Sequence, residues 1–319
     1  MTYEQNLIKA MNYDYPDEIP IAVNILPAAW IHYGDEMRRF AADYPEFITA
    51  VPKDDAEARS WLPDTYRYGT TVDEWGCVWS NNYEGMEAIV TKHPVPNRGD
   101  ILSLKIPENR DGRVPHGFMY LRLLDLRGFE EAMYDFADEC DELQILIDKA
   151  VEYNCIQIEI KLPKVGEVMS FGDDLGMQKG LAVGADKWRK YLKPCYKKMF
   201  SIVRDAGKYV YMHTDGMIYE IMPDLMDCGV NMINPQIGAN GLDNLVRVCK
   251  GKIPIQLDLD RQAIPFATPS WIGSHVRECV EALYLPRGGL ALVAELNYDI
   301  PLGNAAALLD ALTEIKRHR

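Results

Sequence analysis

The pattern of apolar and polar positions predicts β-strands that end in polar residues. In Tyr209-Val-Tyr-Met-His-Thr-Asp-Gly216, alternate residues share a face, so His213 and Asp215 lie on one side of the strand and Met212 on the other. Packing alone does not explain a histidine and a carboxylate at the last positions of one face. Polar residues also gather late in other alternating runs, at residues 155–161, 232–236, 253–260 and 290–297.

Segments with the period of an α-helix lie between these runs. They cover residues 185–207, 219–228, 242–249, 269–283 and 304–316, and glycines close the first two. A single alternating run also fits an antiparallel sheet with one wet face. Strands that alternate with helices, however, imply right-handed crossovers and a parallel sheet. We therefore predict an α/β fold.

The number of strands favours a closed barrel over an open sheet. Strands are expected at residues 19–25, 118–124, 155–161, 209–213, 232–235, 255–260 and 290–296, with an eighth near residues 70–80. No Gly-x-Gly-x-x-Gly follows an early strand, so a dinucleotide-binding sheet has little support. We predict one (β/α)8 TIM-barrel domain over residues 1–319, with an irregular insertion at about residues 40–115.

Charge and cysteine content indicate which partners and which environment the protein has. A formal net charge of -14 disfavours nucleic acid, which binds basic surfaces. The chain has no signal pattern and no run of 18 or more apolar residues, so we expect a soluble cytoplasmic protein without a membrane partner. Its seven cysteines form no Cys-x-x-Cys pair and are expected to be reduced thiols, several of them in the core.

Short motifs spread along the chain carry a family resemblance. They are Asp14-Tyr-Pro-Asp-Glu-Ile-Pro20, Thr71-Val-Asp-Glu-Trp-Gly76, Leu126-Arg-Gly-Phe-Glu130, Asp173-Asp-Leu-Gly-Met-Gln-Lys-Gly180, His213-Thr-Asp-Gly216, residues 224–236 and Ile300-Pro-Leu-Gly-Asn304. In this order they resemble the uroporphyrinogen decarboxylase superfamily over nearly the whole chain. That resemblance implies a (β/α)8 barrel and one of two chemistries.

The first chemistry is cofactor-free decarboxylation of a porphyrinogen that carries eight carboxylates. Such decarboxylases hold their substrate with an early Arg-Gln-Ala-Gly-Arg-like segment. The corresponding segment here, Leu26-Pro-Ala-Ala-Trp-Ile-His-Tyr-Gly34, has no arginine. Because a polycarboxylate needs cationic or amide donors, decarboxylation is the alternative function.

The second chemistry is corrinoid-dependent methyl transfer. The segment from Thr71 to Gly76 and the segment Asp173-Asp-Leu-Gly176 look more like this branch, particularly its members that demethylate methoxylated aromatics. The resemblance implies a small O- or N-methylated donor and a partner protein that carries cobalamin. A homodimer is left open.

The same branch includes enzymes that bind zinc through a His-x-Cys pair and a later cysteine. This chain has His213 but Asp215 in place of the first cysteine, and Glu295 near the later one. Nitrogen and oxygen ligands also suit zinc, with an open position for the atom that the methyl group leaves. We expect zinc ligands at His213 and Glu295, with Glu159 or Asp215 as the third.

Further site residues follow from the strand ends and the loops. We expect His213, Asp215 and Asp174 to be catalytic. Asp174 and its neighbour Asp173 either close the site or cap a turn and the next helix. Substrate contacts are expected from Tyr33, Trp75, Asn234, Gln236, Asp258 and Asn297, while His32, His93, His116 and His275 are expected to be structural or surface residues. A catalytically inert binding protein is a third alternative, but buried carboxylates are costly to keep without a ligand.

Overall fold

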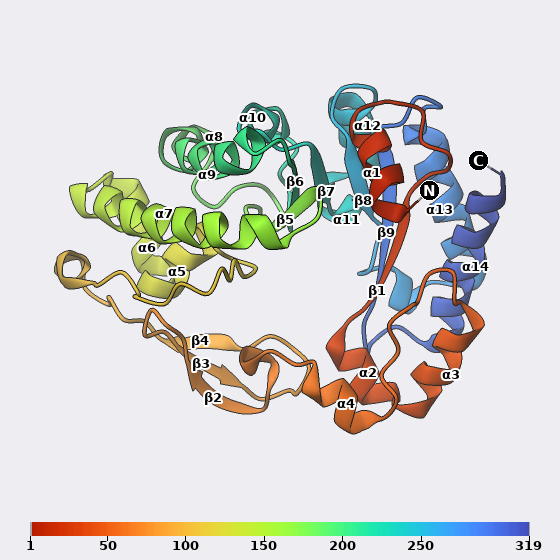
Figure 1. Cartoon of the computed structure of the whole chain (residues 1–319), viewed down its shortest axis with the longest axis horizontal. Helices are drawn as coiled ribbons and strands as arrows, with labels where there is room; N and C mark the ends of the chain where they lie inside the picture. Colours follow the sequence, from red (N-terminus) through yellow and green to blue (C-terminus); the bar gives the residue numbers. More distant parts are fainter. Residues whose placement is uncertain (1, 319) are drawn as a thin grey trace. The chain divides into compact units, whose positions relative to one another are not determined.

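The computed structural model describes residues 2–318, and the chain forms two compact units (Figure 1). Unit 1 contains the described residues up to Thr71, residues 79–89 and those from Gln256 onward. Unit 2 contains residues 72–78 and 90–255. None of the described helices is both long and apolar enough to cross a membrane.

Unit 1 is assembled from the two ends of the chain. Its elements are α1 (Tyr3–Met11), β1 (Ile21–Ile25), α2 (Pro27–Tyr33), α3 (Asp35–Asp43), α4 (Asp55–Ser60), η1 (Asp64–Tyr66), most of β8 (Ile255–Asp258), η5 (Ile264–Phe266), α13 (Pro269–Leu283), β9 (Leu290–Leu296) and α14 (Leu302–His318). Strands β1 and β9 are parallel, and α13 packs along α14. Every residue of β9 except Glu295 is buried, as expected for a parallel strand covered on both faces.

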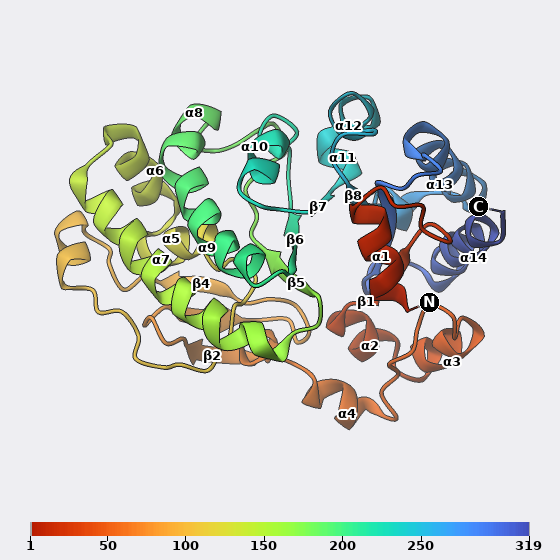
Figure 2. The ribbon, with the colours of Figure 1, turned by 45° about the horizontal axis from the view of Figure 1, so that its top comes forward.

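Unit 2 carries the helices and strands of the middle of the chain (Figure 2). Its elements are η2 (Arg98–Ser103), α5 (Tyr120–Arg127), α6 (Phe129–Asp138), α7 (Asp141–Lys161), η3 (Leu162–Lys164), β5 (Val168–Gly172), α8 (Ala185–Lys187), the π-helical turn η4 (Trp188–Leu192), α9 (Lys193–Asp205), β6 (Tyr209–Thr214), α10 (Met222–Asp227), β7 (Met232–Pro235), α11 (Ile237–Asn240) and α12 (Leu242–Cys249). Helices α7 and α9 pack side by side.

The strands of unit 2 pair in parallel. β5 pairs with β6, β6 pairs with β7, and β7 pairs with β8 through Ile233 and Ile255. The register sets His213 of β6 opposite Gly172 of β5 on one side and opposite Asn234 of β7 on the other. Parallel strands end at the same edge of a sheet, so the residues that follow β5, β6 and β7 are brought together.

The predicted α/β class is confirmed, together with most of its elements. The strands expected at residues 19–25, 209–213, 232–235, 255–260 and 290–296 are β1, β6, β7, β8 and β9, and the helices expected between them are present. The parallel pairing of these strands is also as expected. Closure into an eight-stranded barrel and the single-domain organisation stay predictions.

Two predicted strands are wrong. Residues 118–124 lie mostly in α5, and residues 155–161 are the last turns of the 21-residue helix α7. Helix α7 has acidic Asp141 and Glu142 in its first turn, which favours helix initiation, and no glycine or proline interrupts it. Its buried positions, including Leu143, Leu146 and Ile147, recur at helical spacing. The alternation of isoleucines at residues 156–160 was therefore misleading.

The region predicted as an irregular insertion contains short elements. Strands β2 (Gly69–Val72), β3 (Val78–Asn81) and β4 (Ile89–Lys92) form a three-stranded sheet in the order β2-β3-β4. The eighth strand expected near residues 70–80 therefore belongs to this small sheet. Strand β5 had not been predicted, although it directly precedes Asp173.

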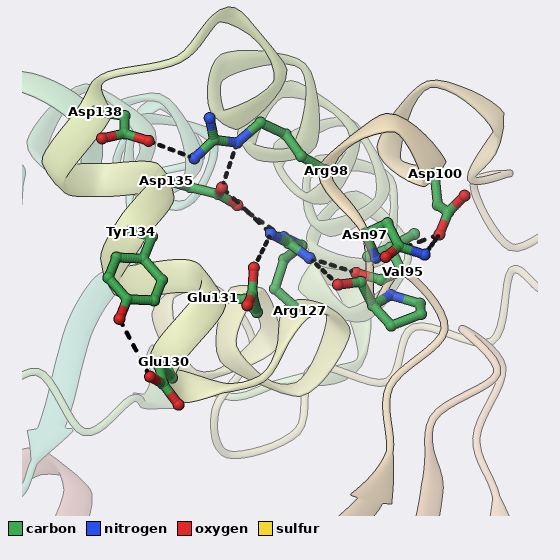
Figure 3. A network of polar contacts seen from close by, with 11 residues as sticks. Val95, Asn97, Arg98, Asp100, Arg127, Glu130, Glu131, Tyr134, Asp135 and Asp138 are labelled. Atoms are coloured by element: carbon green, nitrogen blue, oxygen red, sulfur yellow. Dashed lines mark hydrogen bonds and ion pairs between the residues drawn. The ribbon is translucent and has the colours of Figure 1, made fainter.

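A buried network of ion pairs and hydrogen bonds connects α5, α6 and the segment around Val95 in unit 2 (Figure 3). Arg127 and Asp135 have side chains only 1% and 0% exposed, and the Arg127 Nε lies 2.7 Å from an Asp135 carboxylate oxygen. Arg127 also donates to the Val95 carbonyl at 2.8 Å. Arg98 pairs with both aspartates of α6: its Nε lies 2.8 Å from Asp135 Oδ1, and its Nη2 lies 2.7 Å from Oδ2 of the more exposed Asp138. The network thus ties the two helices to the segment that precedes η2.

We predict that Asp135→Asn destabilises the protein by about 3–5 kcal/mol, because the buried Arg127 charge loses its buried counter-ion and keeps only the 3.2 Å ion pair with Glu131, whose side chain is 53% exposed. Asp138→Asn is the matched control: its side chain is 58% exposed, so about 1 kcal/mol or less should be lost. Urea unfolding followed by circular dichroism measures both. Similar losses in the two variants would contradict the ranking.

Candidate active site

Strand β6 positions the first part of the site. Val210, Met212 and Thr214 are fully buried, whereas Tyr209, Tyr211 and His213 on the opposite face are only partly buried. The Thr214 hydroxyl accepts a hydrogen bond of 3.1 Å from the Leu175 N–H. The inward face of β6 thereby anchors the loop after β5, and His213 is left on the accessible face.

The loops after β5 and β6 touch through two glycines. A Cβ added to Gly216 would lie 2.2 Å from the Gly176 carbonyl carbon, and one added to Gly176 would lie 2.7 Å from the Gly216 carbonyl carbon. Gly216 also has φ +81°, a conformation that side chains disfavour. The Gly176 N–H donates to the Asp215 carbonyl at 3.1 Å, and the Met217 N–H donates to the Met177 carbonyl at 2.8 Å. Only glycine allows this approach.

Adjacent aspartates in the loop after β5 have different roles. Asp173 is completely buried, and its carboxylate accepts hydrogen bonds from the N–H groups of Met119, Tyr120 and Leu121 at the start of α5. The Tyr196 hydroxyl donates to it at 2.6 Å. Burial raises the pKa of Asp173, and these hydrogen bonds oppose that shift. Asp173 therefore caps the start of α5, which precedes it in the chain, and not the next helix that the sequence suggested.

The polar centre of the site consists of Asp174 and four neighbouring residues. Asp174 Oδ1 lies 3.1 Å from His116 Nε2 and accepts the Asp215 N–H at 3.2 Å. His213 Nε2 lies 3.2 Å from Asp215 Oδ1, and the two imidazole rings are 5.7 Å apart between centroids. His213 Nδ1 lies 2.7 Å from Asn234 Oδ1. The two histidines thus turn their Nε2 atoms towards carboxylates.

The electrostatics of this centre favour its charged forms. Burial lowers the pKa of His213, but Asp215, Asn234 and Asp174 outweigh it and hold that pKa above the ordinary histidine value. Burial raises the pKa of Asp174, but His116 and His213 bring it below the ordinary value. An anionic Asp174 beside imidazoles can bind a cation or receive a proton.

Gln236 and Asn240 brace the loop that follows Gly216. The Gln236 side-chain oxygen accepts the Gly216 N–H at 3.0 Å. The Asn240 side-chain oxygen accepts the N–H groups of Ile218 and Tyr219, and its amide nitrogen donates to the Gly216 carbonyl. The side-chain oxygen of Gln236 thus contacts the backbone, and the expected substrate contact of Gln236 stays a prediction.

Four of the site residues expected from the sequence come together in unit 2, as described above. They are Asp174, His213, Asp215 and Asn234. Glu159 does not join them, because it lies on the exposed surface of α7, and the predicted strand that placed it at a strand end is wrong. Trp75 is buried against Tyr153, with ring centroids 5.2 Å apart, and contributes to local packing.

The remaining expected residues belong to unit 1. Glu295 forms an ion pair with Arg261. Tyr33 donates to the Ile300 carbonyl at 2.8 Å, and the Asn297 side-chain oxygen accepts the Tyr298 N–H at 2.9 Å. Asp258 is buried on β8. Their roles in substrate or metal binding stay predictions.

His116 was expected to be structural or on the surface. It lies in the loop before α5, and no local pattern in the sequence marks it. Its place depends on Gly172, where an added Cβ would lie 2.5 Å from His116 Nδ1, and on the 2.8 Å hydrogen bond from the Gly117 N–H to the Gly172 carbonyl. Because β5 was not predicted, the proximity of His116 to Asp174 could not be inferred.

We predict that Gly216→Ala costs more than about 2 kcal/mol, because an alanine there meets both a disfavoured φ and a backbone overlap. Gly303→Ala is the control, since its Cβ meets nothing within 4 Å at an exposed position of α14; its stability should stay within about 1 kcal/mol of the original. Thermal and urea unfolding test both variants. A tolerated Gly216→Ala would mean that the two loops can separate.

Comparison with known proteins identifies the family. The family model described as uroporphyrinogen decarboxylase (URO-D) matches residues 118–315. The chain therefore belongs to the uroporphyrinogen decarboxylase family. No protein of curated function matches it in sequence.

Solved structures agree with the α/β fold. A methyltransferase from Methanosarcina mazei is similar over 98% of this chain and 99% of its own, with a TM-score of 0.69 and 19% identity. A dihydropteroate synthase from Xanthomonas albilineans (TM-score 0.32, 16% identity, 53% and 61% covered) and one from Yersinia pestis (0.33, 15%, 53% and 62%) are similar over about half of this chain. At such low TM-scores these two support no conclusion about it.

Proposed function

We propose that this protein is a corrinoid-dependent methyltransferase. It would take a methyl group from a small O- or N-methylated compound, such as a methoxylated aromatic, and pass it to a cobalamin on a partner protein. The observation that carries the proposal is the group of His116, Asp174, His213 and Asp215 at the ends of β5 and β6. The full-length likeness to a protein named as a methyltransferase supports it.

The segment after β1 favours methyl transfer over porphyrinogen decarboxylation. Residues 26–34 form α2 and its flanks, where Ala28, Ala29 and Trp30 are buried and no arginine occurs. This segment corresponds to the carboxylate-binding segment of the true decarboxylases. A substrate with eight carboxylates requires cationic donors, which this segment does not offer.

Methyl transfer requires an acid at the departing atom. The donor's carbon–oxygen or carbon–nitrogen bond breaks, and its electron pair stays on the heteroatom, which is a poor leaving group until a proton or a metal ion takes up that charge. The corrinoid, when bound to its partner protein, supplies a nucleophilic cobalt(I) for the methyl carbon. In this proposal, His213 and Asp174 supply or hold the acid.

We predict that incubation with cobalt(I) cobalamin and methoxybenzoates or methylamines gives methylated cobalamin, detected by its absorption spectrum. His213→Gln should lower the rate by about 10²- to 10⁴-fold, because it removes a group that acts on the departing atom. His32→Gln, an exposed histidine of unit 1, is the control and should leave the rate unchanged.

Uroporphyrinogen is offered in a parallel assay. Its conversion at about 1 per second or faster, without any methyl transfer, would reverse the ranking and assign the alternative decarboxylase function. If neither methyl transfer nor decarboxylation occurs with any compound of the panel, the result argues against both functions.

A further inference from the structure

We propose that His116, Asp174 and His213 form a divalent-metal site, with zinc as the preferred ion. This inference rests on the proposed function for its purpose, since the metal would act on the departing heteroatom, but metal binding itself can be tested without the reaction. Two of the three ligands differ from those expected from the sequence: His116 and Asp174 stand in place of Glu295 and Glu159.

The ligand atoms are already close together. One nitrogen from each histidine and one carboxylate oxygen of Asp174 all lie within 4.8 Å of one another, and His116 Nε2 is 3.1 Å from Asp174 Oδ1. Tetrahedral zinc with ligands at about 2.0–2.2 Å places neighbouring ligand atoms about 3.3–3.5 Å apart. Small side-chain rotations therefore suffice to reach that geometry.

Backbone contacts hold the three ligands in place. His213 lies in β6, Asp174 lies in the loop fixed by the contact between Gly176 and Gly216, and His116 lies against Gly172. One ligand is thus on a strand, and the other two are in loops that contact strand β5 or the loop after β6.

Asn234 orients His213 for metal binding. An amide oxygen can only accept, so the 2.7 Å contact between His213 Nδ1 and Asn234 Oδ1 places the hydrogen on Nδ1. In the neutral ring that binds a metal, the lone pair is then on Nε2, the atom that lies 3.2 Å from Asp215 Oδ1. Histidines that bind metals are typically held in this way by a hydrogen bond to their other nitrogen.

The exposure of the group suits an open coordination site. The side chains of His116, Asp174 and His213 are 34%, 29% and 21% exposed, so a small ligand can reach them from solvent. Asp215, 3.2 Å from His213 Nε2, adds a second carboxylate whose charge would help to balance a divalent ion. Three protein ligands and one open position are typical of catalytic zinc.

A thiolate site finds less support. The group of potential ligands found among the described residues contains no cysteine. Nitrogen and oxygen atoms are therefore the donors that this group offers.

The test is titration of the metal-free full-length protein with Zn²⁺, and with Co²⁺ as a spectroscopic probe. We expect about one equivalent to bind, with a cobalt spectrum that lacks a thiolate charge-transfer band. His116→Gln, Asp174→Asn and His213→Gln should each weaken binding by at least about 100-fold. His32→Gln and Glu295→Gln should not change it, and circular dichroism checks that every variant is folded.

Two variants of Asn234 test its positioning role. Asn234→Leu should weaken Zn²⁺ binding by about 10- to 100-fold, while Asn234→Asp keeps an acceptor and should bind as tightly as the original or more tightly. In the metal-free protein, at a pH high enough for the His213 ring to be neutral, its ¹⁵N shifts should report hydrogen on Nδ1 in the original and loss of that preference in Asn234→Leu. A merely structural role would leave this preference unchanged.

Three results would overturn the metal site: less than about a tenth of an equivalent bound after Zn²⁺ supplementation, a thiolate band with Co²⁺, or loss of metal in Glu295→Gln but not in His116→Gln. Failure of the methyl-transfer assay with normal metal binding would count against the proposed function alone.

Discussion

The close approach of Gly176 to Gly216 is the constraint on which the rest of the site depends. It brings the loops after two neighbouring parallel strands into backbone contact, and each loop carries one carboxylate of the polar centre, Asp174 or Asp215. A side chain at either glycine would push the loops apart by more than the tolerance of a hydrogen bond. The two short motifs therefore act as one structural unit, although about 40 residues separate them in the chain.

The neighbouring residues Asp173 and Asp174 have different roles: Asp173 stabilises the fold, and Asp174 belongs to the polar centre. Successive side chains of an extended segment point in opposite directions, so Asp173 points into the core and Asp174 points towards His116. The buried carboxylate is stabilised by the first N–H groups of α5 and by Tyr196. Because α5 begins only four residues after His116, the same interaction also limits where His116 can lie.

Sequence reasoning succeeded where the hydrophobic period and the chain order agreed. His213 and Asn234 were expected on adjacent strand ends, and the register of β6 and β7 pairs them. The strand predicted at residues 155–161 was wrong, because a run of only seven alternating residues also fits one turn after another of a helix. The helical spacing shows only in the longer run that begins at Asp141. His116 could not be found at all, since its position is set by β5 and by Gly172 and not by its own neighbours.

The carboxylates of Asp174 and Asp215 determine which chemistry this centre can support. A thiolate is soft and stays bound to zinc, whereas carboxylate and imidazole ligands leave the ion a stronger Lewis acid for an oxygen or nitrogen atom. Asp174 and Asp215 also keep a positive His213 stable when no metal is present, which explains why its pKa is raised despite burial. The same charges that favour a proton on His213 can therefore favour a divalent ion, and either one can withdraw charge from a departing methyl donor.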